Sequence, residues 1–176
     1  MPASEYIKTH SAYRYADAIV SGNVDEMTLI PEVAAIYKAP AYVIKQCADF
    51  LKVANGDDPE YVISEHKCRQ IDGLLKLLIM PRGLQFGKTL YDCTVSYQWL
   101  FYVAVLAEVS RQDPEKRRYE RAVLEICRKN FKTYTIGTLF IILFLTEPPF
   151  SKFFSVAPDL DLSKEVKDAI QNTLSV

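Results

Sequence analysis

The hydrophobic pattern of the chain changes at residue 113, and the fold that we expect follows from that change. Before it, apolar residues recur at helical spacing in four segments, and Gly22 and Pro81 stand where two of them stop. The four segments are residues 6–22, 31–56, 62–80 and 94–112. We therefore expect residues 1–112 to form a mainly helical N-terminal region.

The pattern after the charged turn at 113–118 is different. Two short apolar runs with β-branched and aromatic residues, 119–127 and 151–158, flank a helical segment at about 133–145. A closing helix covers 162–176. The order strand, loop, helix, strand and helix is the beginning of a βαβ arrangement with a parallel sheet. We expect an α/β fold in which this second part, 113–176, carries an incomplete sheet.

The composition excludes several classes of protein. The chain has 176 residues, of which 49% are hydrophobic and 24% charged, so it can bury a core. Its net charge of −1 indicates no overall basic surface for nucleic acid. The start lacks the pattern of a signal peptide, and the most apolar run, Ile136–Leu145, has about half of the roughly 20 residues that a membrane span needs.

The four cysteines are scattered and include no CxxC pair, which predicts reduced thiols and no zinc site. They are Cys47, Cys68, Cys93 and Cys127.

Two stretches match part of the sequence motif of a phosphate-binding loop. In such a loop, backbone N–H groups and a helix N-terminus surround the phosphate, a lysine contacts it, and a Ser or Thr hydroxyl binds Mg²⁺. The first stretch, Gly87-Lys88-Thr89, matches the Gly-Lys-Ser/Thr end of this motif. However, a helix and a proline precede it where a strand is needed, so a solvated loop between helices is the simpler interpretation.

The second stretch, CRKNFKT at 127–133, has the better setting. An apolar run with strand character precedes it, and an apolar helix follows. Lys132 and Thr133 then stand where the phosphate lysine and the Mg²⁺ hydroxyl belong. Phe131 occupies the position of a glycine, and a β-carbon there costs on the order of 1 kcal/mol if φ is positive.

The segments KRRYERAVLEICRKNFKT (116–133) and SKFFSVAPDLDLSKEVKDAI (151–170) resemble the N-terminal ATPase region of phage terminase large subunits. These proteins are motors that pump viral DNA into capsids. The family has a basic-aromatic lead-in, a strand, a loop of the form Arg-Lys-x-Gly-Lys-Ser/Thr and a second strand ending in Ala-Pro. It also has an upstream Trp/Gln pair, to which Gln98 and Trp99 correspond.

The resemblance implies a P-loop ATPase that uses ATP and Mg²⁺. In that family pattern Lys132 contacts the β- and γ-phosphates, Thr133 ligates Mg²⁺, Arg128 senses the γ-phosphate and Gln98 reads the adenine. The remaining residues of the nucleotide loop are Asn130, Phe131 and Tyr134. The implied partners are double-stranded DNA, portal and small terminase proteins and further copies of the chain, in the cytoplasm of a bacterial host and without a membrane.

The resemblance also implies that these residues are part of a longer protein. The family carries its second acidic motif and a nuclease domain farther downstream than residue 176, and we interpret Asp159 and Asp161 as N-terminal caps of the last helix. Phosphoryl transfer depends on a positioned metal and nucleophile, so we expect this chain alone to hydrolyse ATP poorly or not at all.

Simpler interpretations stay open for each residue. Lys132 and Thr133 can begin an ordinary helix, Arg128 can be a surface cation, and Gln98 can hydrogen-bond within a core. A basic cluster can lie near DNA or form a solvated turn. It comprises Arg111, Lys116, Arg117, Arg118 and Arg121.

Two alternatives concern the whole chain. It can be a non-enzymatic helical interaction protein with a decayed phosphate loop, in which Phe131 packs in the core. It can also be a small kinase-like enzyme that uses the loop at 87–89.

Overall fold

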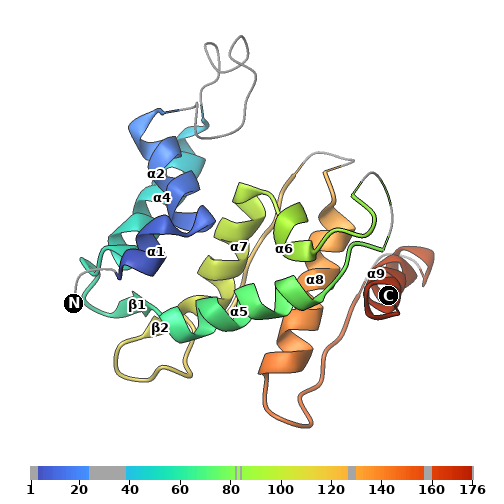
Figure 1. The fold of residues 1–176 in the computed structure, drawn as a ribbon. Helices are drawn as coiled ribbons and strands as arrows, with labels where there is room; N and C mark the ends of the chain where they lie inside the picture. Colours follow the sequence, from blue (N-terminus) through green and yellow to red (C-terminus); the bar gives the residue numbers. More distant parts are fainter. Residues whose placement is uncertain are drawn as a thin grey trace. The chain divides into compact units, whose positions relative to one another are not determined.

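The computed structural model describes residues 4–23, 39–81, 83, 85–126, 130–156 and 160–175. This part of the chain is α/β, mostly helical, with one small antiparallel sheet (Figure 1). In chain order the elements are α1 (Glu5–Thr9), α2 (Ser11–Ser21), α4 (Ala41–Ala54), β1 (Tyr61–Ile63), α5 (Glu65–Leu77), α6 (Leu90–Cys93), α7 (Ser96–Ala107), β2 (Glu108–Ser110), α8 (Lys132–Thr146) and α9 (Leu160–Leu174).

Contacts divide the chain into two compact units. Unit 1 comprises Met1–Arg69 and Val95–Ala122, and unit 2 comprises Gln70–Thr94 and Val123–Val176. The division that we predicted between residues 112 and 113 stays a prediction.

The helices of unit 1 begin and end where short polar signals predict. Nδ1 of His10 accepts a hydrogen bond from the N–H of Ala12 at 3.1 Å and caps α2, which separates it from α1. Gly22, with φ 73°, ends α2 in the left-handed conformation. Pro40 is the N-cap of α4. Helix α2 packs against both α4 and α7, and this contact buries Ala16, Cys47, Phe50, Trp99 and Val103.

The only sheet among the described residues pairs β1 with β2 in antiparallel register, Val62 opposite Val109. Val62 and Ile63 of β1 were predicted as part of the helix at 62–80, and all of β2 as part of the helix at 94–112. Each strand has three residues, which is too short to show an alternation of apolar and polar positions. The pairing across the sheet, and not the local sequence, determines their conformation.

In unit 2, α8 packs against α9, and both helices were predicted. Gly137 of α8 allows the close approach, because a β-carbon there would lie 3.3 Å from the Cβ of Ala169. Ile141 and Ile142 of α8 are buried.

The two strands predicted on either side of α8 are not present in the described residues, so these residues do not show the expected parallel sheet. Residues 119–126 and 151–156 have an irregular backbone. A strand is stabilised by a paired neighbour and by burial of one face. Val123 is 89% and Val156 92% exposed, so neither valine lies under a covering layer.

Within the described parts of the chain, no helix combines the length and the apolarity needed to cross a membrane.

Candidate phosphate-binding site

The loop before α8 adopts the backbone conformation that a glycine would give it. Phe131 is the N-cap of α8 and has φ 55° and ψ 24°, in the left-handed region. Lys132, Thr133 and Tyr134 then form the first turn of the helix. The structure thus places a left-handed residue directly before the lysine, where a phosphate loop has its glycine.

Two hydrogen bonds hold Phe131 in this conformation. Its carbonyl oxygen accepts from the N–H of Thr135 at 2.8 Å and from the Thr135 hydroxyl at 3.0 Å. Thr135 is buried, so both bonds are shielded from water. They offset part of the roughly 1–2 kcal/mol that a left-handed conformation costs a residue with a β-carbon.

The start of α8 favours an anion. Its N-cap provides no side-chain hydrogen bond, and the first turn contains no acidic residue. The first N–H groups of a helix have no intrahelical partner and carry a partial positive charge. Asn130 and Lys132 are exposed and Thr133 is half-buried, so the start of α8 is accessible to solvent.

The ring of Phe131 does not fill the core. It is 58% exposed, so the alternative in which Phe131 packs as a core residue does not agree with the structure.

The predicted arginine of the loop, Arg128, lies outside the described residues. Five of the other predicted site residues are consecutive and lie at the start of α8. They are Asn130, Phe131, Lys132, Thr133 and Tyr134.

Gln98 belongs to unit 1 and is 6% exposed. Its side-chain oxygen accepts a hydrogen bond from the N–H of Val95 at 3.0 Å, near the start of α7. This bond gives Gln98 a structural task as an N-terminal cap. Its predicted contact with adenine stays a prediction.

The loop with the intact Gly-Lys-Thr letters uses its donors internally. The N–H of Gly87 donates to the Met80 carbonyl at 3.2 Å, and the N–H of Lys88 donates to the Gln85 carbonyl at 3.1 Å. The Thr89 hydroxyl donates to the Asp92 carboxylate at 2.7 Å and accepts from the Asp92 N–H at 3.1 Å. This is the bonding of a turn that caps the four-residue helix α6, and its hydroxyl is already engaged.

The basic cluster after α7 is partly structural. Nη1 of Arg118 lies 2.7 Å from Oε2 of the buried Glu108, and Arg111 donates to the carbonyls of Asp58 and Gly56 at 3.0 and 3.1 Å. Sequence reasoning missed Glu108. Its signal was available, because it is the first charged residue after a run of 15 uncharged ones that begins at Cys93.

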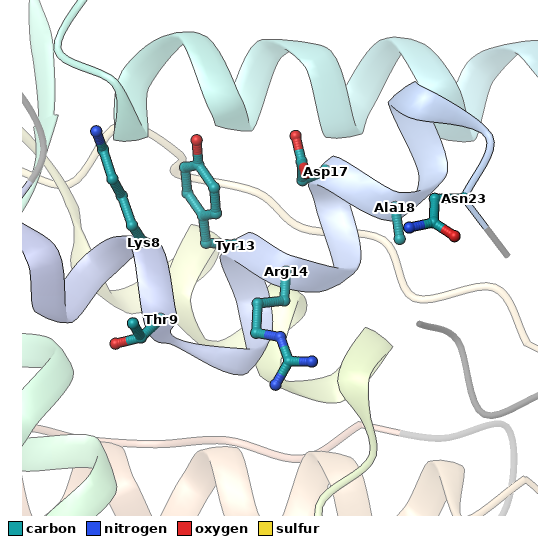
Figure 2. A pocket seen from close by; sticks show the side chains of 7 residues that line it. All are labelled: Lys8, Thr9, Tyr13, Arg14, Asp17, Ala18 and Asn23. Atoms are coloured by element: carbon teal, nitrogen blue, oxygen red, sulfur yellow. The ribbon is translucent and has the colours of Figure 1, made fainter. Parts of the chain in front are cut away.

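An open pocket of about 420 Å³ lies along α1 and α2 in unit 1. Figure 2 shows Lys8, Tyr13 and Asp17 projecting to one side of these helices and Arg14 to the other, so the two cations do not converge. A second opening of about 420 Å³ involves Phe144 and the residues after α8. Neither contains a predicted site residue.

No group of three or more metal-ligating side chains occurs among the described residues. No protein-family model, curated protein or solved structure matches the chain.

Proposed function

We propose that this chain is the N-terminal part of an ATP-driven DNA-packaging motor of the terminase large-subunit kind, with its phosphate loop at 128–134. The observation that carries the proposal is the left-handed backbone of Phe131 directly before Lys132 and an uncapped helix. It supports the choice of this loop over the one at 87–89, where the N–H groups of Gly87 and Lys88 and the Thr89 hydroxyl are already hydrogen-bonded.

The residues of the loop divide the work of holding a nucleotide. The N–H groups of Lys132, Thr133 and Tyr134 and the α8 dipole stabilise phosphate oxygens, and the Lys132 ammonium neutralises their charge. The Thr133 hydroxyl is a hard oxygen ligand of the kind that Mg²⁺ takes together with water and phosphate oxygens. When bound, Mg²⁺ supplies charge neutralisation between the β- and γ-phosphates.

Phe131 shapes this site in two ways. Its left-handed backbone turns the chain so that the N–H groups of the residues that follow it can face one anion. Its β-carbon and ring occupy space next to the phosphates that a glycine leaves free, so we expect weaker nucleotide binding than a glycine-containing loop gives.

The wider parts of the proposal rest on the resemblance of 116–133 and 151–170 to the terminase family. They are the parallel sheet, Arg128 and Gln98 as nucleotide contacts, DNA and portal or small terminase proteins as partners, assembly with further copies and work in the host cytoplasm. From this chain we expect binding of Mg-ATP without multiple turnovers.

The experiment is calorimetric titration of the chain with Mg-ATP. We expect Lys132→Ala to weaken binding at least tenfold, because it removes the charge that faces the phosphates. Lys88→Ala is the matched control, since it makes the same change in the other Gly-Lys-Thr-like loop and should leave binding unchanged. Equal binding by Lys132→Ala, or loss of binding only in Lys88→Ala, contradicts the site.

A non-enzymatic interaction role is the second candidate, and the exposed apolar residues after α8 favour it. Phe150 is 99% exposed, and Phe154 and Val156, which follow it within six residues of the chain, are also exposed. Exposed apolar side chains can contact a protein partner. This role predicts that the chain binds no nucleotide, so the same calorimetric titration separates the two candidates.

A further inference from the structure

Glu108 is a buried carboxylate that is only half paired. It begins β2, is fully buried in unit 1, and its Oε2 lies 2.7 Å from Nη1 of Arg118. Among the described side chains, its Oε1 is the one buried polar atom without a hydrogen-bond partner. An unsatisfied oxygen on a buried charged group raises the free energy of the folded state. The stability of this part of the fold therefore depends on whether Glu108 is ionised.

The backbone around Glu108 holds the chain that follows β2. The N–H of Arg118 donates to the Glu108 carbonyl at 2.9 Å, and the N–H of Ser110 donates to the Lys116 carbonyl at 2.9 Å. A bridge pairs Val109 with Arg117. Strand β2 therefore holds residues 116–118 through its backbone, and Glu108 bonds Arg118 through both its carbonyl and its side chain.

The charged groups near Glu108 come from four parts of unit 1. Arg118 follows the turn, and its guanidinium also lies over the rings of Tyr61, 5.3 Å away, and Tyr119, 5.1 Å away. Asp58 stands before β1 and Asp49 lies on α4, and both act on Glu108 with negative charge. Lys52 of α4 acts on Asp58, and Arg111 of the turn donates to its carbonyl.

These surroundings favour a bound proton on Glu108. Burial raises the pKa of Glu108 to about 7, and Asp58 and Asp49 raise it as well, against the hydrogen bond and charge of Arg118. The pKa of Asp58 is lowered: its own burial works in the other direction, but the N–H groups of Tyr61 and Glu60 bond its carboxylate. Asp58 thus stays ionised beside Glu108.

We propose that Glu108 is a proton-sensitive latch, which holds residues 116–118 against β2 while it is protonated and releases them when it ionises. An unpartnered oxygen costs less free energy to bury on a neutral carboxyl than on an ionised one. Arg118 attracts the ionised form, but one guanidinium contact does not replace the water that burial removes. Ionisation therefore favours an open state in which Glu108 reaches water.

The direction of the pH effect follows from where the proton binds more tightly. The closed state holds its proton up to about pH 7, whereas an exposed glutamate releases it near its ordinary value of 4.5. The latch is therefore most stable below pH 4.5 and loses stability as the pH rises towards 7. Between pH 6 and pH 8 the ratio of open to closed states should rise about tenfold.

The latch lies a few residues before the end of unit 1. Residues 116–118 are followed at once by Tyr119–Ala122, the end of unit 1, and the chain then enters unit 2 at Val123. The proton on Glu108 thus governs how firmly unit 1 holds the segment that continues to the loop before α8. This inference does not depend on whether that loop binds a nucleotide.

The experiment combines two measurements on the 176-residue chain. An NMR titration of the Glu108 carboxyl carbon should show a midpoint near pH 7. Hydrogen exchange should show that the protection factor of the Arg118 amide falls about tenfold between pH 6 and pH 8. In Glu108→Gln, which is neutral at every pH, this fall should disappear.

The matched control is Glu115→Gln, which removes a carboxylate from the same turn. Glu115 is exposed, and its carboxylate lies 3.6 Å from Lys67, so this variant should keep the tenfold change. A carboxyl midpoint near 4.5, or a tenfold change that persists in Glu108→Gln, overturns the latch. If Glu108→Gln does not fold, the carboxyl titration of the unmodified chain decides alone.

Discussion

Phe131 combines a strained backbone with a side chain that gains little from packing. A left-handed residue with a β-carbon costs about 1–2 kcal/mol, and a ring that is mostly in water returns little of this by burial. The hydrogen bonds from Thr135 to its carbonyl maintain the conformation all the same. Backbone strain of this kind is concentrated at functional turns.

This strain predicts the result of Phe131→Gly. We expect the free energy of unfolding to rise by about 1 kcal/mol, because glycine adopts a positive φ without a steric cost. We also expect tighter binding of Mg-ATP, because the phosphates gain the space of the ring. Urea denaturation and calorimetry measure the two effects.

Phe150 provides the matched control for that variant. It is the other non-glycine residue with positive φ among the described residues, at 71°, and it follows the C-terminal end of α8. Phe150→Gly should stabilise the fold by a similar amount and leave nucleotide binding unchanged. Equal gains in affinity from both variants would show that Phe131 has no special relation to the phosphate.

The two Gly-Lys-Thr-like loops differ as helix starts, which yields a prediction at the scale of elements. The Thr89 hydroxyl caps α6, so Thr89→Ala should lower the free energy of unfolding by about 1 kcal/mol without changing nucleotide binding. Thr133 is not a cap, so Thr133→Ala should change stability little and weaken the Mg²⁺ dependence of binding. Denaturation and calorimetry with and without Mg²⁺ check both variants, and the reverse pattern would assign the site to 87–89.

The contact between α8 and α9 depends on a glycine. Gly137→Leu should lower the free energy of unfolding by about 1–3 kcal/mol, since even a β-carbon would lie 3.3 Å from Ala169. Gly73 of α5 is exposed, and a β-carbon added there would have no neighbouring atom within 4 Å, so Gly73→Leu should instead stabilise by about 0.5–1 kcal/mol. Urea denaturation of both variants measures the difference, and shifts in the same direction would contradict the described packing.

How far the sequence predicts these elements depends on their length. Apolar periodicity over ten or more residues located α2, α4, α7, α8 and α9, and Gly22 marked one end correctly. The three-residue strands β1 and β2 carry no such signal, since their pairing partner is about 47 residues away in the chain. At 119–126 a strand was predicted where the structure has none. Strand-like composition does not form a strand without a paired neighbour.

For the site, the predicted secondary structure on either side of each loop was more informative than the match of single residues to the motif. The helix after Phe131 was predicted, and it distinguishes this loop from the one at 87–89, where α6 has only four residues. The left-handed φ of Phe131 could not be read from a phenylalanine. The position of Glu108 after an uncharged run was a usable signal, but its pairing with Arg118 is visible only in the folded chain.

At the scale of the whole molecule, the cysteines report on folding. Among the described residues, Cys47, Cys68 and Cys93 are thiols outside any disulfide. Cys47 and Cys68 are fully buried, and burial raises the pKa of Cys47 to about 11. The thiolate is the reactive form, so the folded chain should protect both residues from alkylation at pH 8.

Alkylation followed by mass spectrometry of peptides checks this prediction. Labelling of Cys47 and Cys68 should follow the urea transition seen by Trp99 fluorescence, whereas the partly exposed Cys93 should react earlier. Rapid labelling of Cys47 in the absence of urea would contradict the packing of α2 against α4.

The claim that a phosphate binds at the start of α8 can be tested atom by atom. Titration of the ¹⁵N-labelled chain with Mg-ATP should shift the backbone amide signals of Lys132, Thr133 and Tyr134 first and most. The amides of Gly87 and Lys88 should stay in place, because their N–H groups already donate to carbonyls of their own turn. Shifts confined to residues 87–89, or no shift at residues 132–134 at saturating nucleotide, would contradict the account.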